Sequence, residues 1–309
     1  MAEAGPGDIS YNGRGRGQTG SAAPAAALGR RLTTNDQQRR LGQISTLLID
    51  LDGVIYIGNT PLPGVPEFFS TLRQLGLRYV LLTNNSTLTT AQFVAKVRSM
   101  GVPASEEEVL TSAEATAAYL AGQAPPGTGV YVIGETGLRE AMRSRGFNLD
   151  SERPSFVVVG MDRQLTYEKL ARGCNYIAEG AAFIGSNADV TLPTERGLIP
   201  GCGALLAALK ATTGVEPMII GKPEPRMLEL AMRRLGVDPA NTAMVGDRLD
   251  TDIVAGARAG VATIMVTTGI STREEAADAA VKPDFIVDDL RGLAAALIAA
   301  KGVQAESLA

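Results

Sequence analysis

The sequence predicts an α/β protein, with a doubly wound parallel-sheet core and a smaller inserted α/β domain. From residue 44 onward, short apolar runs alternate with segments whose apolar residues recur at helical spacing. The runs are continuously apolar, as at 47–49, which is typical of parallel strands covered on both faces. After residue 127 a block with strands and helices of its own interrupts the series. These three observations favour two α/β units.

The individual elements follow from the same patterns. The run at 45–50 predicts the first strand, and one apolar helical stripe predicts a helix over 65–76, formed by Phe68, Phe69, Leu72 and Leu75. The other expected strands are 79–82, 129–133, 156–159, 182–185, 217–220, 242–246, 262–266 and 284–287. The other expected helices are 90–100, 112–121, 136–146, 167–179, 203–213, 224–235, 251–259, 272–280 and 289–300.

Composition and turn residues predict the domain organisation. Residues 1–43 are poor in large apolar residues and predict a mostly disordered tail, whose GxGxxG match at 15–20 follows no strand and is therefore not a nucleotide loop. Pro- and Gly-rich turns at 125–129 and 214–217 are the natural hinges. We therefore expect a core of residues 44–127 and 216–301, an inserted domain at 128–215 and a short tail at 302–309.

Composition also limits the chemistry. The chain has 309 residues, 45% apolar content and a net charge of −4, so nothing favours nucleic acid as a partner. No apolar run approaches the roughly 18 residues of a membrane span. Two cysteines without a CxxC motif fit a reducing cytoplasm. Histidine is absent, which excludes histidine-based triads and histidine-ligated metals. A bound metal would be a hard cation on oxygen ligands, with Mg²⁺ the first choice.

Two acidic residues follow the first strand. Asp50 and Asp52 are expected on the same side of the chain because strand side chains alternate, and two such carboxylates need a cation or a proton between them. A structural Asp-Gly turn is the alternative. An EF-hand loop fails on spacing, because with Gly53 as its sixth residue the first and twelfth positions would be Leu48 and Asn59.

Three later strand ends are also polar. Thr83 and Asn84 follow strand 79–82 and offer donors to an anion, or an ordinary helix cap. Lys222 follows strand 217–220 in a Gly-Lys-Pro turn, where a solvated lysine is the alternative. Three aspartates follow strand 242–246, and a helix N-terminus readily explains only one of them: Asp247, Asp250 and Asp252. We expect all four strand ends to meet at one edge of a single sheet.

These four clusters, in this order, resemble the haloacid dehalogenase (HAD) superfamily of phosphohydrolases over about residues 44–290. The resemblance is closest to subclass IIA, which includes nitrophenyl phosphatase-like and phosphoglycolate phosphatase-like enzymes. That subclass inserts an α/β cap between its second and third motifs, where residues 128–215 lie here. The segments 186–189 and 200–203 are also similar to that subclass. The resemblance implies a Rossmann-like core and a cap that roofs the active site.

The resemblance also implies a role for each cluster. Asp50 would attack phosphorus to form an aspartyl-phosphate, and Asp52 would act as acid and then base. Phosphate oxygens would be bound by Thr83, the Asn84 amide and Lys222. Mg²⁺ would be held by Asp50, the Asp52 carbonyl and Asp247, with Asp252 orienting these ligands.

The cap would select the leaving group of a small-molecule phosphate ester. Asp162, Arg163 and Asn187 are the candidates, and a structural loop role is equally open for each. Dimerisation through the cap is common among such enzymes. Two alternatives stay open: a phospho-receiver that stores phosphate on aspartate, and a non-hydrolytic sugar- or nucleotide-phosphate binding module. Phosphoglycolate, sugar phosphates and nucleoside monophosphates all remain candidate substrates.

Overall fold

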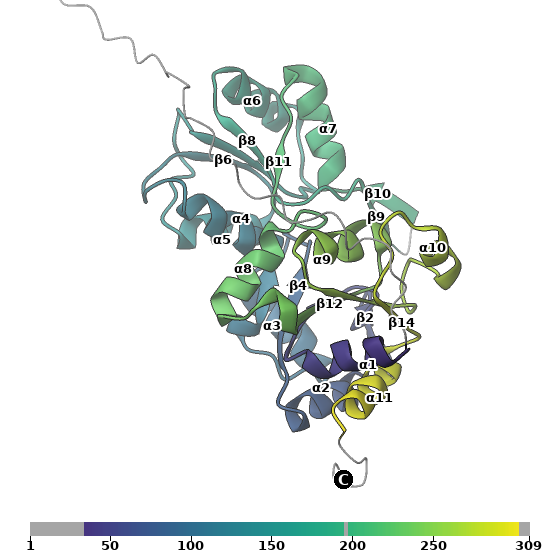
Figure 1. Ribbon diagram of the computed structural model, residues 1–309. Helices are drawn as coiled ribbons and strands as arrows, with labels where there is room; N and C mark the ends of the chain where they lie inside the picture. Colours follow the sequence, from purple (N-terminus) through teal and green to yellow (C-terminus); the bar gives the residue numbers. More distant parts are fainter. Residues whose placement is uncertain (1–33, 195–196, 303–309) are drawn as a thin grey trace, which may run out of the picture.

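The computed structural model describes residues 34–194 and 197–302, and most of their strands form two parallel sheets (Figure 1). The larger sheet has the order β14-β13-β12-β1-β4-β5. Its strands are β1 (Thr46–Asp50), β4 (Arg78–Thr83), β5 (Val109–Thr111), β12 (Thr242–Gly246), β13 (Ala262–Val266) and β14 (Phe285–Val287). The smaller sheet has the order β11-β8-β7-β6. It comprises β6 (Val130–Ile133), β7 (Phe156–Val159), β8 (Ala182–Gly185) and β11 (Met218–Ile219).

Helices cover both faces of the larger sheet. Leu47 and Ile49 of β1 pack in one apolar cluster with α2 (Val65–Gln74), α3 (Thr90–Ser99) and α11 (Leu290–Ala300). Leu48, between them, packs in a second cluster. Its helices are α4 (Ser112–Ala121), α5 (Thr136–Ser144), α8 (Arg226–Leu235) and α9 (Val254–Arg258). Because β1 buries both of its faces, its sequence is continuously apolar, and the predicted doubly wound fold is confirmed.

The smaller sheet has an apolar cluster of its own. Helices α6 (Tyr167–Ala178) and α7 (Cys202–Thr213) pack against one face of it, and these elements lie together at the top of Figure 1. Residues on the opposite face of the smaller sheet, such as Val132 and Val158, join the second cluster of the larger sheet. The two sheets are therefore packed against a shared apolar layer.

The register of β1 fixes where the polar strand ends lie. β1 sits between β12 and β4, with Ile49 opposite Val245 and Asp50 opposite Leu82. All of these strands run in the same direction, so the residues that follow β1, β4 and β12 meet at one edge. That edge carries Asp50, Thr83 and Asp247.

One expectation about the sheets is wrong. The strand that precedes Lys222 does not belong to the larger sheet, because β11 pairs with β8 of the smaller sheet. The sequence boundary at residue 216 would have assigned it to the core. Strands of both sheets are equally apolar, so their composition did not distinguish the two. Lys222 nevertheless reaches the edge that carries Asp50, as described below.

Several short elements were not predicted. Helix α1 (Thr34–Gln43) lies within the segment expected to be a disordered tail, while residues 1–33 lie outside the described residues. Leu41 buries its side chain in the core, and Lys301 donates to the carbonyls of Gly42 and Ile44. Strand β5, two hairpins and a π-helical turn were also not predicted: the hairpins are β2–β3 (Tyr56–Ile57 and Thr60–Pro61) and β9–β10 (Thr191–Thr194 and Gly197–Pro200), and the turn is Leu249–Ile253. Helix α10 (Arg273–Asp278) lies where a helix over 272–280 was expected.

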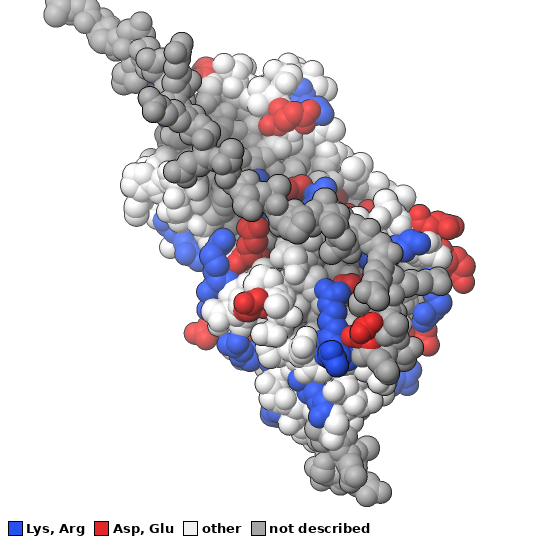
Figure 2. Space-filling model, viewed as in Figure 1, with Lys and Arg blue, Asp and Glu red and all other residues white. Residues whose placement is uncertain are grey.

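The surface in Figure 2 carries positive and negative side chains interspersed over the part of the chain that the structure describes. Among those residues, no helix combines the length and the apolar character that crossing a bilayer requires.

Candidate active site

Three aspartates converge at the carboxyl edge of the larger sheet. Asp50 ends β1, Asp247 follows β12, and Asp252 lies in the π-helical turn. One carboxylate oxygen from each lies within 4.8 Å of the others. Their exposed fractions are 9%, 1% and 1%. Such a buried group of acids is costly unless positive charge compensates it.

Lys222 supplies part of that charge. Its Nζ lies 2.5 Å from Asp50 Oδ1 and 2.6 Å from Asp252 Oδ1, and the residue is 2% exposed. Burial lowers the pKa of Lys222, but the carboxylates of Asp252 and Asp50 outweigh this, and the net effect raises it. The ammonium is therefore a fixed charge in the site.

The acids remain under-compensated by this single lysine. Burial raises the pKa of Asp50 well above its ordinary value, with Lys222 opposing and the neighbouring acids adding to the effect. Burial and the charge of Asp252 raise the pKa of Asp247 to about 7, although the hydrogen bond from the Ile270 N–H and the charge of Lys222 lower it. Burial thus disfavours the ionised form of both acids, and a cation bound beside them would favour it.

The surroundings of the Asp247 carboxylate suit a ligand of a hard cation. Its Oδ2 accepts the Ile270 N–H at 2.8 Å, whereas its buried Oδ1 has no hydrogen-bond partner. A Cβ on Gly269 would lie 2.0 Å from Oδ2, and one on Gly53, where φ is +81°, would lie 2.5 Å from it. Two glycines thus keep space beside a carboxylate with an unpaired oxygen. This donor set, all oxygen and acidic, fits Mg²⁺.

Asp52 does not lie where strand alternation placed it. The three converging carboxylates include Asp50 but not Asp52, which is exposed and forms a bridge to Tyr56. Strand β1 ends at Asp50 and the chain turns at Gly53, so the alternation rule no longer applies. Partial desolvation raises the pKa of Asp52, and the charge of Lys96 opposes this.

Thr83 and Asn84 occupy the end of β4. The Thr83 hydroxyl accepts the N–H of Asn85 at 3.1 Å, which leaves its hydrogen available to an anion. The Asn84 side chain donates to Asp189 Oδ2 at 3.0 Å and to the Lys222 carbonyl at 2.9 Å. Both of its donors are therefore already used within the protein.

The three cap candidates are engaged by neighbouring residues. The Asp162 carboxylate accepts from Lys169 Nζ at 2.7 Å, and Arg163 forms a two-point ion pair with Glu135. These contacts lie within the smaller α/β unit. Asn187 instead donates to the Asn84 carbonyl at 2.7 Å, at the edge that carries the aspartates. Of the three, only Asn187 is brought into contact with another predicted site residue.

Sequence reasoning missed two parts of this edge. The loop after β13 lies against Asp247 through Ile270, and its Thr268 hydroxyl donates to the Gly53 carbonyl at 2.6 Å. This polar strand end, Thr267-Thr268-Gly269, could have been found by the rule that identified the other four. Lys96 lies 3.7 Å from the centre of the Tyr56 ring and donates to the Gly58 carbonyl at 2.7 Å. A lone lysine on helix α3 gives no such signal.

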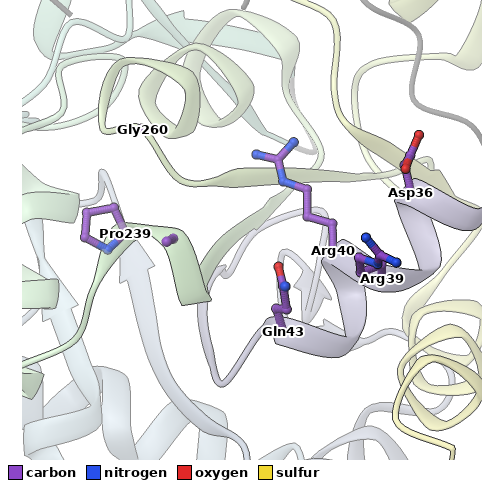
Figure 3. A pocket seen from close by; sticks show the side chains of 7 residues that line it. Asp36, Arg39, Arg40, Gln43, Pro239 and Gly260 are labelled. Carbon is purple, nitrogen blue, oxygen red and sulfur yellow. The ribbon is translucent and has the colours of Figure 1, made fainter.

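A separate surface pocket of about 540 Å³ lies beside α1 (Figure 3). Its lining residues include Arg39, Arg40 and Gln43, and Arg40 is ion-paired with Asp284 at 2.5 Å. None of the predicted site residues lines it. The acid group, rather than this pocket, is therefore the candidate for chemistry.

Comparison with known families gives two matches along the chain. Residues 47–148 match a family model described as haloacid dehalogenase-like hydrolase, and residues 219–293 match one described as HAD-hydrolase-like. Together these segments contain Asp50, Thr83, Lys222, Asp247 and Asp252.

Individual proteins extend the similarity to both α/β units. The 5′-nucleotidase YutF of Bacillus subtilis is 47% identical over 79% of this chain and 94% of its own length. An acid sugar phosphatase of Staphylococcus aureus is 44% identical over 80% of this chain and 96% of its own length. The crystal structure of a 4-nitrophenylphosphatase from Thermotoga maritima superposes with a TM-score of 0.80 and 37% identity, covering 84% of this chain and 99% of that one. The resemblance drawn from the four motifs is confirmed, and the chain belongs to the haloacid dehalogenase-like hydrolases.

Proposed function

We propose that this protein is a Mg²⁺-dependent phosphatase that hydrolyses small-molecule phosphate monoesters through an aspartyl-phosphate on Asp50. The observation that carries the proposal is the buried group of Asp50, Asp247 and Asp252, in which Lys222 pairs with Asp50 and Asp252 and one oxygen of Asp247 has no partner. The family membership and the phosphatases among the relatives support the same conclusion.

Each residue has a role in this scheme. Asp50 Oδ attacks phosphorus, the bond to the leaving oxygen breaks, and Asp52 gives that oxygen a proton. Asp52 then takes a proton from the water that attacks the aspartyl-phosphate, which restores Asp50 and releases phosphate. Lys222 and the Thr83 hydroxyl bind the non-bridging oxygens as charge redistributes. The exposed position of Asp52 supports its role, because leaving groups and water must reach it.

Asp50, Asp247 and the Asp52 carbonyl would hold Mg²⁺, and Asp252 would orient the set. The ion would neutralise the approach of an anionic nucleophile to a dianionic phosphate. Burial disfavours the ionised form of Asp50 and Asp247, and a cation bound beside them would favour it.

We further propose that residues 44–127 and 216–301 form the catalytic core and that 128–215 form the cap that covers it. The partner would be a small phosphate ester, with sugar phosphates and nucleoside monophosphates favoured by what the relatives are named to act on. Dimerisation through the cap and a cytoplasmic location stay predictions.

The test is turnover of 4-nitrophenyl phosphate with and without a chelator. We expect activity that needs Mg²⁺ and that is lost in Asp50→Asn. Wild-type turnover by Asp50→Asn would rule out the nucleophile. Stoichiometric phosphorylation of the protein without release of inorganic phosphate would instead support a phospho-receiver. Binding without turnover across a panel of metabolite phosphates would support a non-hydrolytic module.

A further inference from the structure

Asn84 holds the backbone of Lys222 at two points. Its Oδ1 accepts the Lys222 N–H at 2.9 Å, and its Nδ2 donates to the Lys222 carbonyl, also at 2.9 Å. The same Nδ2 donates to Asp189 Oδ2 at 3.0 Å. These partners fix the orientation of the amide, because the flipped form would set Oδ1 against two acceptors. Asn84 therefore pairs with the backbone of Lys222 much as a neighbouring strand would.

The Lys222 loop needs such an anchor. Strand β11 is only two residues long, and its pairing with the smaller sheet is extended by the Gly221 N–H donating to the Ser186 carbonyl. Beyond that point the backbone of Lys222 is held by Asn84. Lysine reaches its target through four flexible methylene groups, so the position of its backbone limits where the ammonium can be held.

Gly221 is the second sign that this contact is built into the loop. An added Cβ at that position would lie 2.7 Å from Asn84 Oδ1 and 2.6 Å from the Ser186 carbonyl oxygen. Both distances are closer than a side-chain carbon tolerates, so only glycine allows the amide of Asn84 to approach the Lys222 backbone. Gly221 and Asn84 thus both contribute to the contact between the Asn84 side chain and the Lys222 backbone.

We propose that Asn84 is a positioning residue, which acts on the reaction by fixing the Lys222 backbone so that the ammonium meets the phosphoryl group beside Asp50. This inference rests on the proposed function, in which Lys222 binds phosphoryl oxygens. It adds to the sequence expectation for Asn84 a role for the side chain, whose two donors are used by Lys222 and Asp189. A displacement of about 1 Å at such a group can cost on the order of 10²-fold in rate.

A double-mutant cycle tests the proposal. Steady-state turnover of 4-nitrophenyl phosphate with Mg²⁺ is measured for the wild type, Asn84→Ala, Lys222→Ala and the double variant. We expect Asn84→Ala to lower kcat/KM by about 10- to 100-fold, and by less than about 3-fold when Lys222 is already absent. Equal losses in both backgrounds would show that Asn84 acts independently of Lys222, and would overturn the proposal.

A second pair of variants distinguishes loss of the contact with Lys222 from a general loss of stability. Asn84→Asp keeps the acceptor for the Lys222 N–H but sets two carboxylates against each other at Asp189. Adding Asp189→Asn restores a donor there, but none to the Lys222 carbonyl. We expect the melting temperature to recover while kcat/KM stays at least about 10-fold low. Recovery of both would overturn the proposal, because the contact with Asp189 alone would then explain the loss.

The outcomes also separate this inference from the proposed function. Asn175→Asp makes the same chemical change on an exposed position of α6, and it should leave turnover unchanged. Wild-type turnover by Asn84→Ala, with Lys222→Ala strongly impaired, would overturn the positioning role alone. Wild-type turnover by Lys222→Ala would overturn both that role and the proposed function of Lys222.

Discussion

Replacing Lys222 by Met should strongly destabilise the metal-free protein at pH 8. Methionine keeps most of the length of the side chain but removes an ammonium whose Nζ lies 2.5 Å from Asp50 Oδ1 and 2.6 Å from Asp252 Oδ1. Removing one partner from a buried ion pair costs about 3–5 kcal/mol, because the remaining charge is left uncompensated. At about 2 °C per kcal/mol for a chain of this size, the melting temperature should fall by roughly 6–10 °C.

The loss should shrink at low pH. Burial raises the pKa of Asp50 well above its ordinary value and, with Asp252, raises that of Asp247 to about 7. Since these folded-state values exceed the unfolded ones, both groups favour the folded state at low pH, and Asp247 loses that contribution as pH rises through about 7. At pH 5 Asp247 of the variant carries a proton, so less charge is left unpaired, and the melting temperature should fall less.

The measurement is thermal unfolding by circular dichroism in the presence of a chelator, at pH 5 and pH 8. Lys210→Met is the matched control, because Lys210 also forms an ion pair, with Glu216 at 2.6 Å, but both side chains are at least half exposed. Such a pair contributes roughly 0–1 kcal/mol. Equal shifts for the two variants, or a Lys222→Met shift that does not depend on pH, would refute the reasoning.

Three other results are expected. Gly269→Ala should raise the Mg²⁺ concentration needed for half-maximal activity by about tenfold or more, because its Cβ would lie 2.0 Å from Asp247 Oδ2. A titration of activity against Mg²⁺ measures this concentration, and an unchanged value would contradict the prediction. Thermal stabilisation by Mg²⁺ should be larger at pH 8 than at pH 5, since protons compete for Asp247 below about pH 7, and a constant shift would count against this site. Thr83→Val should lower kcat/KM by about tenfold or more while Thr83→Ser retains activity; equal activity of the two variants would exclude the hydroxyl as a phosphate donor.

Most of the larger sheet could be predicted because its central strands, β1 and β12, are fully buried. Apolar runs such as 47–49 and 243–245 allow few other structures, and the rule that ligands bind at carboxyl ends then brings Asp50 and Asp247 together. The position of β11 could not be predicted in this way. Its two residues are too few to carry a pattern, and both sheets offer the same kind of partner. Which sheet it joins is decided by packing over long sequence distances.

The residues of the candidate site show the same contrast between what local sequence patterns predict and what they do not. Residue types at strand ends identified Asp50, Lys222, Asp247 and Asp252, because acids and a lysine at these points have few structural uses. The place of Asp52 was misjudged, since a rule for strands was applied beyond the end of the strand. The contacts of Asn84 depend on a loop 138 residues further along the chain, and no local pattern reports such a distance.

Lys222 follows a strand of the smaller sheet, while Asp50 ends a strand of the larger sheet. Because Asn84 after β4 holds the Lys222 backbone, an outward rotation of the smaller unit would have to break the Asn84–Lys222 contact before it could draw the ammonium away from Asp50. The open enzyme would then hold an acid group stripped of its lysine, able to recruit a metal ion but poorly able to bind phosphate. Entry of the ester and the placement of Lys222 beside Asp50 would thus depend on the same movement of the smaller unit.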